Sequence, residues 1–547
     1  MKKQDHKYIF VVGGVMSGVG KGIASSSIGK ILQGRGHKVN LIKIDPYLNV
    51  DAGNMNPTEH GEVFVLESGL ECDQDMGNYE RFLGRSLKQE DYITSGMVYK
   101  SVIEKERNLN YKGKCVEAIP HIRDEILHRI ARAAATNGSN ISVIEIGGTI
   151  GDYQNIMFIE AARVLKVKNP DNVLFVMMSY LPIPGKLGEM KTRPTQNAVR
   201  TLNSYGVQPD IIIARSECAL DRKRKEKIAT SCNVPASLVI SAPDIESIYD
   251  VPVNFEKDNL GENVLGLLGD NSKKRKTDLR KWQNFTRKSK KARNGKKSVN
   301  IAIVGKYFDT GNFVLSDAYL SVIEAIKFSS YQLGVKPIIH WVNSKDLDKD
   351  ATKVKTLGEY DGILTPGGFG EKGIEGKLKV IKYARENKIP YFGLCYGMQL
   401  VVIEYARNVL KLKDANTGEI DSDAKHKVID VMEEQKEKLA KNNYGGTMRL
   451  GVYSANLKKD TIAQKAYSTN KISERHRHRY EVNPKYIEKL SRGGLVFSGV
   501  SPDKKLMEIA ELSKDKHPFF LATQFHPEFQ ARPLSPHPLF TAFIKAC

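Results

Sequence analysis

The stretch YIFVVGGVMSGVGKG, residues 8–22, sets a run of apolar residues directly before a glycine-rich turn that ends at Lys21 and Gly22. Buried parallel strands are continuous apolar runs, so Tyr8–Val12 is predicted as a strand. Ile23–Gln33 has the spacing of a helix, and Val39–Ile44 is a second apolar run. This order predicts a βαβ unit with a phosphate-binding turn at its first corner.

The same pattern continues through the first half of the chain and restarts in the second half. Strands are predicted at 141–146, 173–178 and 211–214, and then at 299–304, 362–365, 390–394 and 519–525. Helices are predicted at 316–328 and 397–406. We therefore expect an α/β protein of two doubly wound domains, 1–268 and 299–547, joined by a basic linker at 269–298.

Composition excludes several classes of protein. The 547 residues are 41% hydrophobic and 27% charged, which is ordinary for a soluble globular chain. No apolar run approaches the roughly 18 residues of a membrane span, and Tyr8–Val12 is too short for a signal peptide. Six cysteines without metal-ligand spacing argue against a disulfide scaffold or a zinc site. We expect a cytoplasmic protein that does not associate with membranes.

The net charge of +21 is concentrated in one segment. Residues 273–297 hold thirteen Lys or Arg and one acid, Asp278, so they account for +12 of the total. A solvated linker or exposed helix is the simpler interpretation, and docking of an acidic partner, a filament neighbour or RNA is the alternative. Only Trp282 and Phe285 add aromatic surface, so nucleic-acid binding is not expected.

The turn at residues 13–22 has the chemistry of a phosphate site. Glycines let backbone N–H groups face a phosphate, the helix N-terminus adds positive potential, and Lys21 adds a full charge. The match to the P-loop pattern is imperfect, because Gly14 is one residue too far from Gly20 and Gly22 replaces Ser or Thr.

Two acids are candidate ligands for the magnesium ion of a nucleotide. Asp75 lies in a short acidic stretch, and Glu145 lies near the end of a very apolar strand, where an ionised carboxylate needs a cation or a metal. A glutamate paired with a local cation remains the alternative. Lys43, at the end of the second strand, is a second cation suited to phosphoryl transfer.

A cysteine nucleophile is predicted in the second half. Gly393-Leu394-Cys395-Tyr396-Gly397 allows a sharp strand-to-helix turn, and a thiolate at a helix N-terminus is a good nucleophile. His526 can act as its base and Glu528 can orient that base. The glycine loop 366–370 offers backbone donors for an oxyanion. The two sites together predict an ATP-driven amination that takes its ammonia from glutamine.

These residues resemble the CTP synthase family over essentially the whole chain. The resemblance implies the reaction UTP + ATP + glutamine → CTP + ADP + phosphate + glutamate. It implies an N-terminal amidoligase domain of dethiobiotin-synthetase-like P-loop fold and a C-terminal class I glutamine amidotransferase domain. The matching stretches are 13–22, 43–47, 60–65, 75–82, 145–149, 191–196, 393–399, 475–483 and 524–529.

The resemblance also assigns roles at matching positions. Cys395 is the nucleophile, His526 the base and Glu528 its partner. Asp75 and Glu145 bind Mg²⁺. The residues expected at ATP are Gly18, Val19, Gly20, Lys21, Gly22, Ile23, Lys43 and Asp75. Those expected at UTP, or at CTP as inhibitor, are Ser17, Asp152, Tyr153, Gln154, Lys191, Thr192, Arg193, Pro194, Thr195, Gln196 and Lys227. Those expected at L-glutamine are Gly368, Tyr396, Gly397, Met398, Gln399, Glu419 and Arg479.

The family also uses GTP as an allosteric activator and works as a homotetramer, so we expect a homotetramer here, and the sequence leaves filament formation open. Three departures from its pattern stand out: Tyr396 follows the nucleophile in place of Leu, Gln154 stands where an acid is expected, and Arg193 replaces Lys. Residues 309–315 resemble an insertion. Gln154 puts feedback inhibition by CTP in question.

Two other functions compete with this interpretation. One is an amidotransferase for another substrate, which the stretch 191–196 disfavours. The other is a regulatory or filament-forming protein without chemistry, which the intact Lys21, Cys395 and His526 disfavour.

Overall fold

The computed structural model describes residues 6–185, 188–270, 278–306, 316–368, 370–371, 373–431 and 448–547. The chain divides into two compact units. The first comprises Met1–Asp51 and Asn78–Thr286, and the second comprises Ala52–Gly77 and Arg287–Cys547. The possible insertion at 309–315 and the first part of the basic segment, 271–277, lie outside the described residues.

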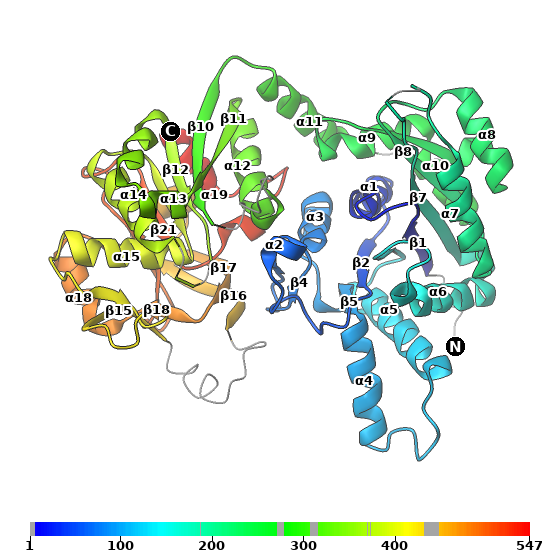
Figure 1. The fold of residues 1–547 in the computed structure, drawn as a ribbon, viewed down its shortest axis with the longest axis horizontal. Coiled ribbons are helices and arrows are strands. Elements are labelled where there is room, and N and C mark those ends of the chain that lie inside the picture. The colour runs from blue at the N-terminus through cyan, green and yellow to red at the C-terminus, as the bar shows by residue number, and fades with distance from the viewer. Residues whose placement is uncertain are drawn as a thin grey trace. The chain divides into compact units, whose positions relative to one another are not determined.

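The first unit is built on a seven-stranded sheet in the order β5-β2-β6-β1-β7-β8-β9, in which every pair is parallel (Figure 1). Parallel pairing needs a crossover between strands, and helices supply most of these crossovers. The strands are β1 (Lys7–Gly13), β2 (Val39–Asp45), β5 (Tyr92–Thr94), β6 (Ile141–Ile146), β7 (Val173–Tyr180), β8 (Ile211–Ser216) and β9 (Val239–Pro243).

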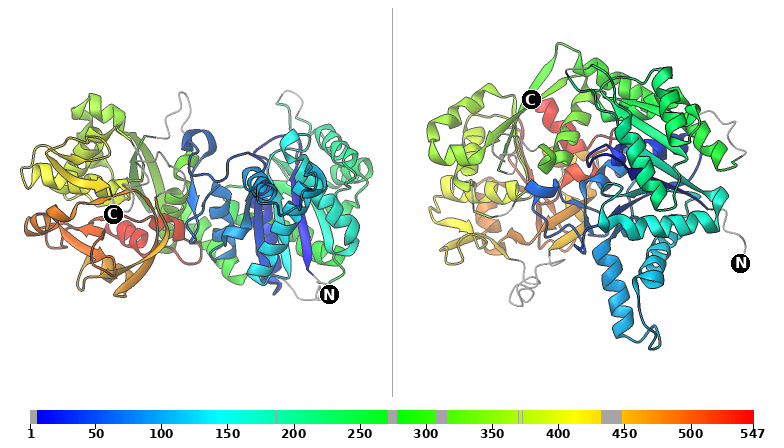
Figure 2. Two further views of the ribbon diagram at one scale, coloured as in Figure 1. Left: turned by 90° about the horizontal axis from the view of Figure 1, so that it is seen from below. Right: turned by 45° about the vertical axis from the view of Figure 1, so that its right-hand side comes forward.

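Helices follow most of these strands along the chain. They are α1 (Lys21–Gly34), α4 (Ser95–Arg107), α5 (Arg123–Asn137), α6 (Ile156–Lys168), α7 (Arg193–Ser204), α8 (Arg222–Cys232), α9 (Val251–Phe255) and α10 (Leu260–Leu267). A further helix, α3 (Gln74–Leu83), crosses the division between the units at Gly77. Figures 1 and 2 show α4 and the loop after it extending away from the sheet.

The basic segment forms a helix with one buried face, α11 (Arg280–Arg293). Trp282 is 1% exposed, and its indole Nε1 donates to the carbonyl oxygen of Tyr249 at 2.7 Å. Phe82 and Phe285 pack against the same ring. The Lys and Arg side chains on the other face are exposed, so this part of the segment is an amphipathic helix rather than a free linker.

The second unit is built on a nine-stranded sheet in the order β11-β10-β12-β13-β21-β20-β19-β16-β17. The pairs from β11 to β21 are parallel, and those from β21 to β17 are antiparallel. Its strands are β10 (Ser298–Gly305), β11 (Lys336–Asn343), β12 (Gly362–Thr365), β13 (Tyr391–Leu394), β16 (Arg449–Leu457), β17 (Lys471–His478), β19 (Val496–Val500), β20 (Met507–Glu511) and β21 (Phe520–Thr523). A small sheet joins β14 (Ala415–Thr417), β15 (His426–Val431) and β18 (Tyr480–Val482).

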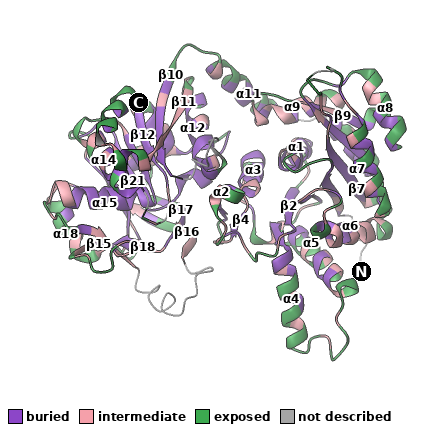
Figure 3. Ribbon diagram, viewed as in Figure 1, coloured by how far each residue is buried: buried purple, intermediate pink, exposed green. Residues whose placement is uncertain are grey.

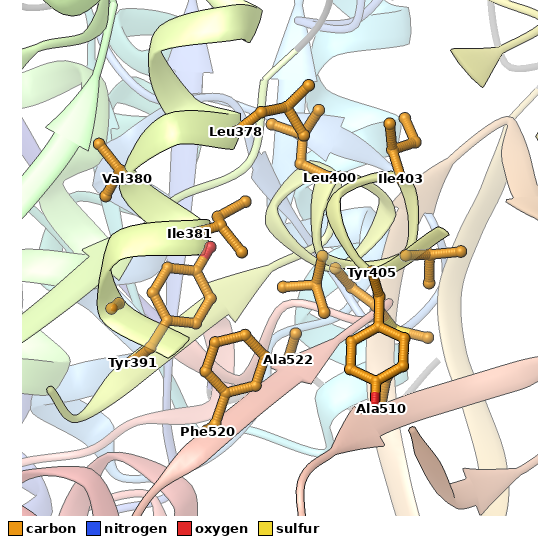
Figure 4. Packing of buried hydrophobic residues seen from close by; sticks show 14 of the residues in the cluster. Leu378, Val380, Ile381, Tyr391, Leu400, Ile403, Tyr405, Ala510, Phe520 and Ala522 are labelled. Atoms are coloured by element: carbon orange, nitrogen blue, oxygen red, sulfur yellow. The ribbon is translucent and has the colours of Figure 1, made fainter. Parts of the chain in front are cut away.

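Helices pack on the large sheet and bury a continuous apolar core. They are α12 (Leu320–Leu333), α13 (Ser344–Lys349), α14 (Ile374–Glu386), α15 (Tyr396–Asn408), α17 (Ile462–Tyr467), α18 (Pro484–Arg492) and α19 (Pro538–Ala546). Figure 4 shows Ile381 of α14, Leu400 of α15 and Phe520 of β21 within one apolar cluster. The strands are mostly buried and the outer helix faces exposed (Figure 3). In the described part of the chain, no helix is long and apolar enough to cross a membrane.

Residues 52–77 belong by their contacts to the second unit, although they come from the first half of the sequence. They contain the short helix α2 (Pro57–His60) and a small antiparallel pair, β3 (Phe64–Val65) and β4 (Glu71–Cys72). The sequence prediction of one continuous domain over 1–268 did not foresee that these residues would pack in the second unit. Hydrophobic patterning indicates that a segment is buried, but not which core it joins.

The predicted α/β class is confirmed, and each predicted strand is present with its ends within two residues. The helix predicted at 316–328 begins later, because a 3₁₀ turn at Ser316–Tyr319 precedes α12.

We predict that Trp282→Ala lowers the stability of the first unit by about 3–5 kcal/mol, because it opens a cavity and removes the indole N–H that donates to the Tyr249 carbonyl oxygen. Urea unfolding followed by circular dichroism measures the change. Lys288→Ala, on the exposed face of the same helix, should stay within about 0.5 kcal/mol of the wild type. Equal stability of the two variants would contradict the prediction.

Candidate active sites

The glycine-rich turn of the first unit joins the end of β1 to the start of α1. Gly18 and Gly20 have φ of +69° and +100°, a region that favours glycine, and Gly20 is the residue before the helix. Lys21 is 8% exposed and donates from Nζ to the carbonyl oxygen of Gly148 at 2.8 Å. The predicted phosphate residues Gly18 to Ile23 therefore lie together at a helix N-terminus with a cation beside them.

Close packing explains the first two glycines of the turn. A Cβ on Gly13 would come within 2.8 Å of Lys21 Nζ, and a Cβ on Gly14 within 2.6 Å of the Cβ of Ala198. Because Ala198 belongs to α7, the same contact brings that helix against the turn.

Lys43 and Glu145 form a buried ion pair at the ends of adjacent strands. They are register partners in the β2–β6 pair, and Lys43 Nζ lies 2.9 Å from Glu145 Oε1 and 3.6 Å from Asp45 Oδ1. The hydroxyl of Tyr79 donates to the other oxygen of Glu145. The structure therefore shows the alternative, a glutamate paired with a local cation. Glu145 also lies at the carboxyl ends of the parallel strands, the edge of such sheets at which ligands commonly bind.

These acids fit a magnesium ion by donor chemistry. Glu145 and Asp45 supply hard carboxylate oxygens, and Asp75 stands in the first turn of α3. Within the described ranges, no three His, Cys, Asp or Glu side chains form a ready metal cage. Mg²⁺ commonly keeps waters and takes substrate phosphates as its other ligands, so an incomplete protein set is compatible with it.

The residues expected at the pyrimidine nucleotide fall at four places in the first unit, one of which is α8, where Lys227 lies. Ser17 is exposed in the glycine turn, Asp152 accepts from the Thr149 N–H at 2.7 Å in the loop after β6, and residues 192–196 form the start of α7. A Cβ added to Gly151 would lie 3.8 Å from the methyl group of Thr201 in α7. The helix α7 therefore contacts this loop as well.

The side chains in this set differ in how they are held. Thr195 is buried and its hydroxyl lies 2.8 Å from that of Ser179, whereas Tyr153 is 90% exposed. Lys191 and, at longer range, Lys227 hold the pKa of the exposed Glu189 below its usual range, which places both cations around one carboxylate.

The sequence prediction missed Arg215. Its guanidinium donates to the carbonyl oxygens of Gly18 and Val19 at 3.3 and 3.4 Å from the end of β8. Beside it lies a hollow of about 130 Å³ with mostly apolar walls that include Ile23, Pro243 and Ile248. A cation that directly follows the apolar run 211–214 was the available signal, since ligands bind at the carboxyl ends of parallel strands.

In the second unit Cys395 occupies a strained turn between β13 and α15. Its φ and ψ are +50° and −99°, and it is 3% exposed. A Cβ on Gly393 would lie 3.0 Å from the Gly397 backbone, and a Cβ on Gly397 would lie 2.5 Å from the Thr365 carbonyl oxygen. Both flanking glycines are therefore needed for the sharp turn that the sequence predicted.

His526 and Glu528 lie beside this turn and are both buried. His526 Nδ1 is 2.7 Å from Glu528 Oε1, and an added Cβ on Gly367 would lie 2.9 Å from His526 Cε1 and 3.7 Å from Cys395 Cβ. Burial alone lowers the pKa of His526, but the charges of Glu528 and Cys395 outweigh it and raise this pKa to about 10. An imidazolium beside a cysteine is a setting in which thiols are good nucleophiles.

A cavity of about 410 Å³ opens on these residues. Its walls include six of the residues predicted for the glutaminase reaction: Gly368, Cys395, Glu419, Arg479, His526 and Glu528. The Gly370 N–H donates to Glu419 Oε1 at 3.1 Å, and burial raises the pKa of Glu419 against the opposing charges of Lys306 and Arg479. A carboxylate and a guanidinium in one cavity suit the amino and carboxylate groups of an amino acid.

The side chains that follow the nucleophile do not line this cavity. Tyr396 and Met398 belong to the apolar core, and Gly397 packs against β12. Gln399 Nε2 donates to the Tyr480 carbonyl oxygen at 3.0 Å, and its amide also contacts Gln524. Only backbone groups of 396–399 are therefore left for a direct contact with glutamine.

The structure accounts for the unusual Tyr396. Its ring is buried, and Lys377 Nζ lies over it at 5.7 Å from the ring centroid. Its hydroxyl lies 3.5 Å from the Gly370 carbonyl oxygen. Burial and the nearby Lys306 lower the pKa of Lys377 to about 7.

Part of the cavity wall comes from the segment 52–77, which the sequence prediction did not place here. Residues 53–57, Glu62 and Val63 line it. The Glu62 carboxylate accepts from the Ser321 N–H at 3.1 Å, at the start of α12, and this favourable charge at a helix N-terminus fixes the segment to the second unit. The sequence carried no signal for this, because the two residues are 259 positions apart.

Comparisons with known proteins agree along the whole chain. Residues 7–269 match the family model described as the CTP synthase N-terminus, and residues 314–546 match the class I glutamine amidotransferase model. Proteins named CTP synthase from Caldanaerobacter subterraneus and Pyrococcus abyssi are each 49% identical, cover 99% of this chain, and are themselves covered over 98% and 97% of their length. The glutaminase domain of the Trypanosoma brucei enzyme, solved with bound acivicin, is 38% identical with a TM-score of 0.42, and the match covers 46% of this chain and 93% of that domain.

We predict that Glu528→Gln slows alkylation of Cys395 by iodoacetamide about tenfold at pH 7, because burial then lowers the pKa of His526 with less charge to oppose it, and a neutral imidazole activates Cys395 less. Mass spectrometry of the Cys395 peptide measures the rate between pH 5 and 9. The exposed Glu488 of α18 provides the matched control Glu488→Gln, which should not change it. An unchanged rate in Glu528→Gln would show that the carboxylate does not set the charge of His526.

Proposed function

This chain belongs to the CTP synthase family, and from that membership we propose which of its residues carry out each half of the reaction. The protein is a glutamine-hydrolysing ligase that aminates UTP to CTP at the expense of ATP. The single observation that carries the residue assignment is the meeting of Cys395, His526 and Glu528 at one cavity of the second unit.

In the glutaminase half, the Cys395 thiolate attacks the side-chain amide carbon of glutamine and forms a C–S bond. His526 donates its proton to the departing nitrogen, so the C–N bond breaks and ammonia leaves a thioester. Water, deprotonated by His526, then attacks the thioester, and glutamate and the free thiolate are released. Glu528 holds the imidazole by its 2.7 Å contact with Nδ1.

Backbone N–H groups near the nucleophile stabilise the oxyanion that forms during attack. The glycine loop around Gly368 and the first turn of α15 present such groups, because α15 begins directly after Cys395. Glu419 and Arg479 bind the amino and carboxylate groups of glutamine, since both face the cavity.

In the synthetase half, the γ-phosphoryl group of ATP moves to the O4 oxygen of UTP and ADP leaves. Ammonia then attacks C4, and phosphate departs with the C4–O4 bond. The turn 18–23 holds the phosphates of ATP with its N–H groups and Lys21, and Lys43 stabilises the charge of the transferred group. The apolar hollow beside Arg215 accommodates the adenine ring.

Mg²⁺ held by Glu145 and Asp75 would neutralise phosphate charge in this half. Glu145 would be one of the residues that hold the ion, and Lys43, 2.9 Å from its Oε1, would add a second positive charge beside the phosphates.

The pyrimidine nucleotide binds along the start of α7 and the loop after β6. Lys191, Arg193 and Lys227 offer cations for its triphosphate, while Ser17, Asp152, Tyr153 and the remaining residues of 192–196 shape the pocket. Gln154 lacks the charge of the acid expected at this position. This difference bears on inhibition by CTP and not on the catalytic residues. We also propose activation by GTP, a cytoplasmic location and a homotetramer, all of which rest on family membership.

We predict that Cys395→Ala removes CTP formation with glutamine and GTP but keeps ammonia-dependent formation within about twofold, because free ammonia needs no thioester. The absorbance of the cytidine product, from UTP and ATP, measures both activities. Cys218→Ala, at an exposed cysteine, is the control. Loss of both activities would contradict two separable sites.

Lys21→Ala is expected to reduce both activities by 10²-fold or more, because it removes the cation at the phosphates. Labelling of Cys395 by a glutamine-analogue electrophile should persist. Lys38→Ala, at an exposed lysine after the same helix, should leave both activities intact. Ammonia-driven synthesis that survives Lys21→Ala would refute the phosphate-site assignment.

A further inference from the structure

The segment 52–77 is attached to one strand of the second unit, β17. Arg475 of this strand is fully buried and donates from its guanidinium to the Val65 carbonyl oxygen at 3.0 Å. Arg477 donates from Nε to Glu71 Oε1 at 2.7 Å and from its terminal nitrogen to the Gly53 carbonyl oxygen at 3.3 Å. Glu71 is itself 3% exposed, so its carboxylate is shielded from solvent and its charge is compensated by Arg477.

The same two arginines also hold the reacting residues, through their backbone. The His526 N–H donates to the Arg475 carbonyl oxygen at 2.8 Å, and the Cys395 thiol lies 3.6 Å from the Arg477 carbonyl oxygen. Side chains two residues apart in a strand point to one face, so both arginines reach the segment 52–77 together. A shift of either side chain therefore moves the carbonyl that positions the base or the nucleophile.

A second path of contacts reaches the base through aromatic rings. Phe64 of β3 meets Phe529 edge to face, with ring centroids 5.0 Å apart. Phe529 in turn stacks on the His526 ring, with centroids 5.0 Å apart and planes 15° apart. The guanidinium of Arg475 lies 5.5 Å from the Phe64 centroid, which joins the two paths.

We propose that the segment 52–77 is a positioning element of the glutaminase site, in which Glu71 acts through Arg477 on Cys395 and Phe64 acts through Phe529 on His526. Arg477 and Phe529 line the cavity, whereas Glu71 and Phe64 lie behind them and act on the site through these two residues. The proposal rests on the roles proposed above for Cys395 and His526. It assigns to the first half of the sequence a direct share in a reaction whose nucleophile and base lie in the second half.

The segment also carries a residue proposed for the other half of the reaction. Only Asp73 and Cys72 separate Glu71 from Gln74, where α3 begins, and Asp75 in its first turn is a proposed magnesium ligand. One short stretch of chain thus carries a residue proposed for each half of the reaction.

The test uses the full chain with Glu71→Gln, which removes the charge but keeps the shape. We expect kcat for glutamine hydrolysis to fall about tenfold, with KM for glutamine and ammonia-dependent CTP formation each within about twofold. Glu71→Asp keeps the charge and should recover at least a third of the lost rate. The control is Glu59→Gln, an exposed glutamate of the same segment, which should match the wild type.

Phe64→Leu provides an independent variant and decides the question if Glu71→Gln does not yield folded protein. It keeps apolar volume but loses the ring edge against Phe529, and we expect hydrolysis to slow about fivefold with ammonia-dependent synthesis unchanged.

Unchanged glutamine hydrolysis in the folded variants would overturn the proposal. An equal fall in both activities would overturn it too, because the segment would then serve the fold in general. Cys395→Ala in the same assays separates this outcome from a failure of the proposed function, since residual hydrolysis there would remove the nucleophile assignment itself.

Discussion

The backbone at Cys395 is held in a conformation that an L-residue rarely adopts, and the second unit depends on keeping it there. Such strain costs about 1–3 kcal/mol and persists only where the surroundings enforce it. The Cys395 N–H donates to the Thr523 carbonyl oxygen at 2.6 Å, and the Met398 N–H donates to the Cys395 carbonyl oxygen at 3.0 Å. Packing of α14 and α15 on β13 and β21 fixes both ends of the turn.

Burial around this turn then decides the chemistry. A carboxylate and an imidazole that are both nearly inaccessible interact far more strongly than they would in water. Glu528 can therefore raise the pKa of His526 although burial alone would lower it. A neutral thiol beside a neutral imidazole would be a poorer nucleophile, so the low dielectric and the strained turn act on the same step.

The two units use one architectural rule in different ways. In the first, the carboxyl ends of parallel strands gather Lys43, Glu145 and Arg215 around the glycine turn. In the second, the strand β13 ends at Cys395, the proposed nucleophile, and its neighbour β21 is followed by His526. Parallel strands align their carboxyl ends at one edge, which is why residues far apart in the chain meet there.

Local pattern made much of this predictable. Continuous apolar runs located the parallel strands, and glycines beside Lys21 and Cys395 located both turns, because these signals arise from backbone sterics within a few residues. The antiparallel strands β16 and β17 were missed, since Arg449–Leu457 is only partly buried along much of its length and Lys471–His478 consists almost entirely of polar residues, although most of these are buried. Arg215 and the buried Lys377 were also missed, because their importance comes from distant partners.

The sequence by itself determined the α/β class, the two turns and the candidates for nucleophile, base and phosphate-binding lysine, since each depends on residue chemistry and short-range spacing. Only the tertiary structure decided that residues 52–77 pack in the second unit and that Arg475 and Arg477 join them to Cys395 and His526. The Arg477–Glu71 contact closes a loop of 406 residues. Such a contact is stable only because packing and burial around it outweigh the chain entropy it costs, and no local pattern records that balance.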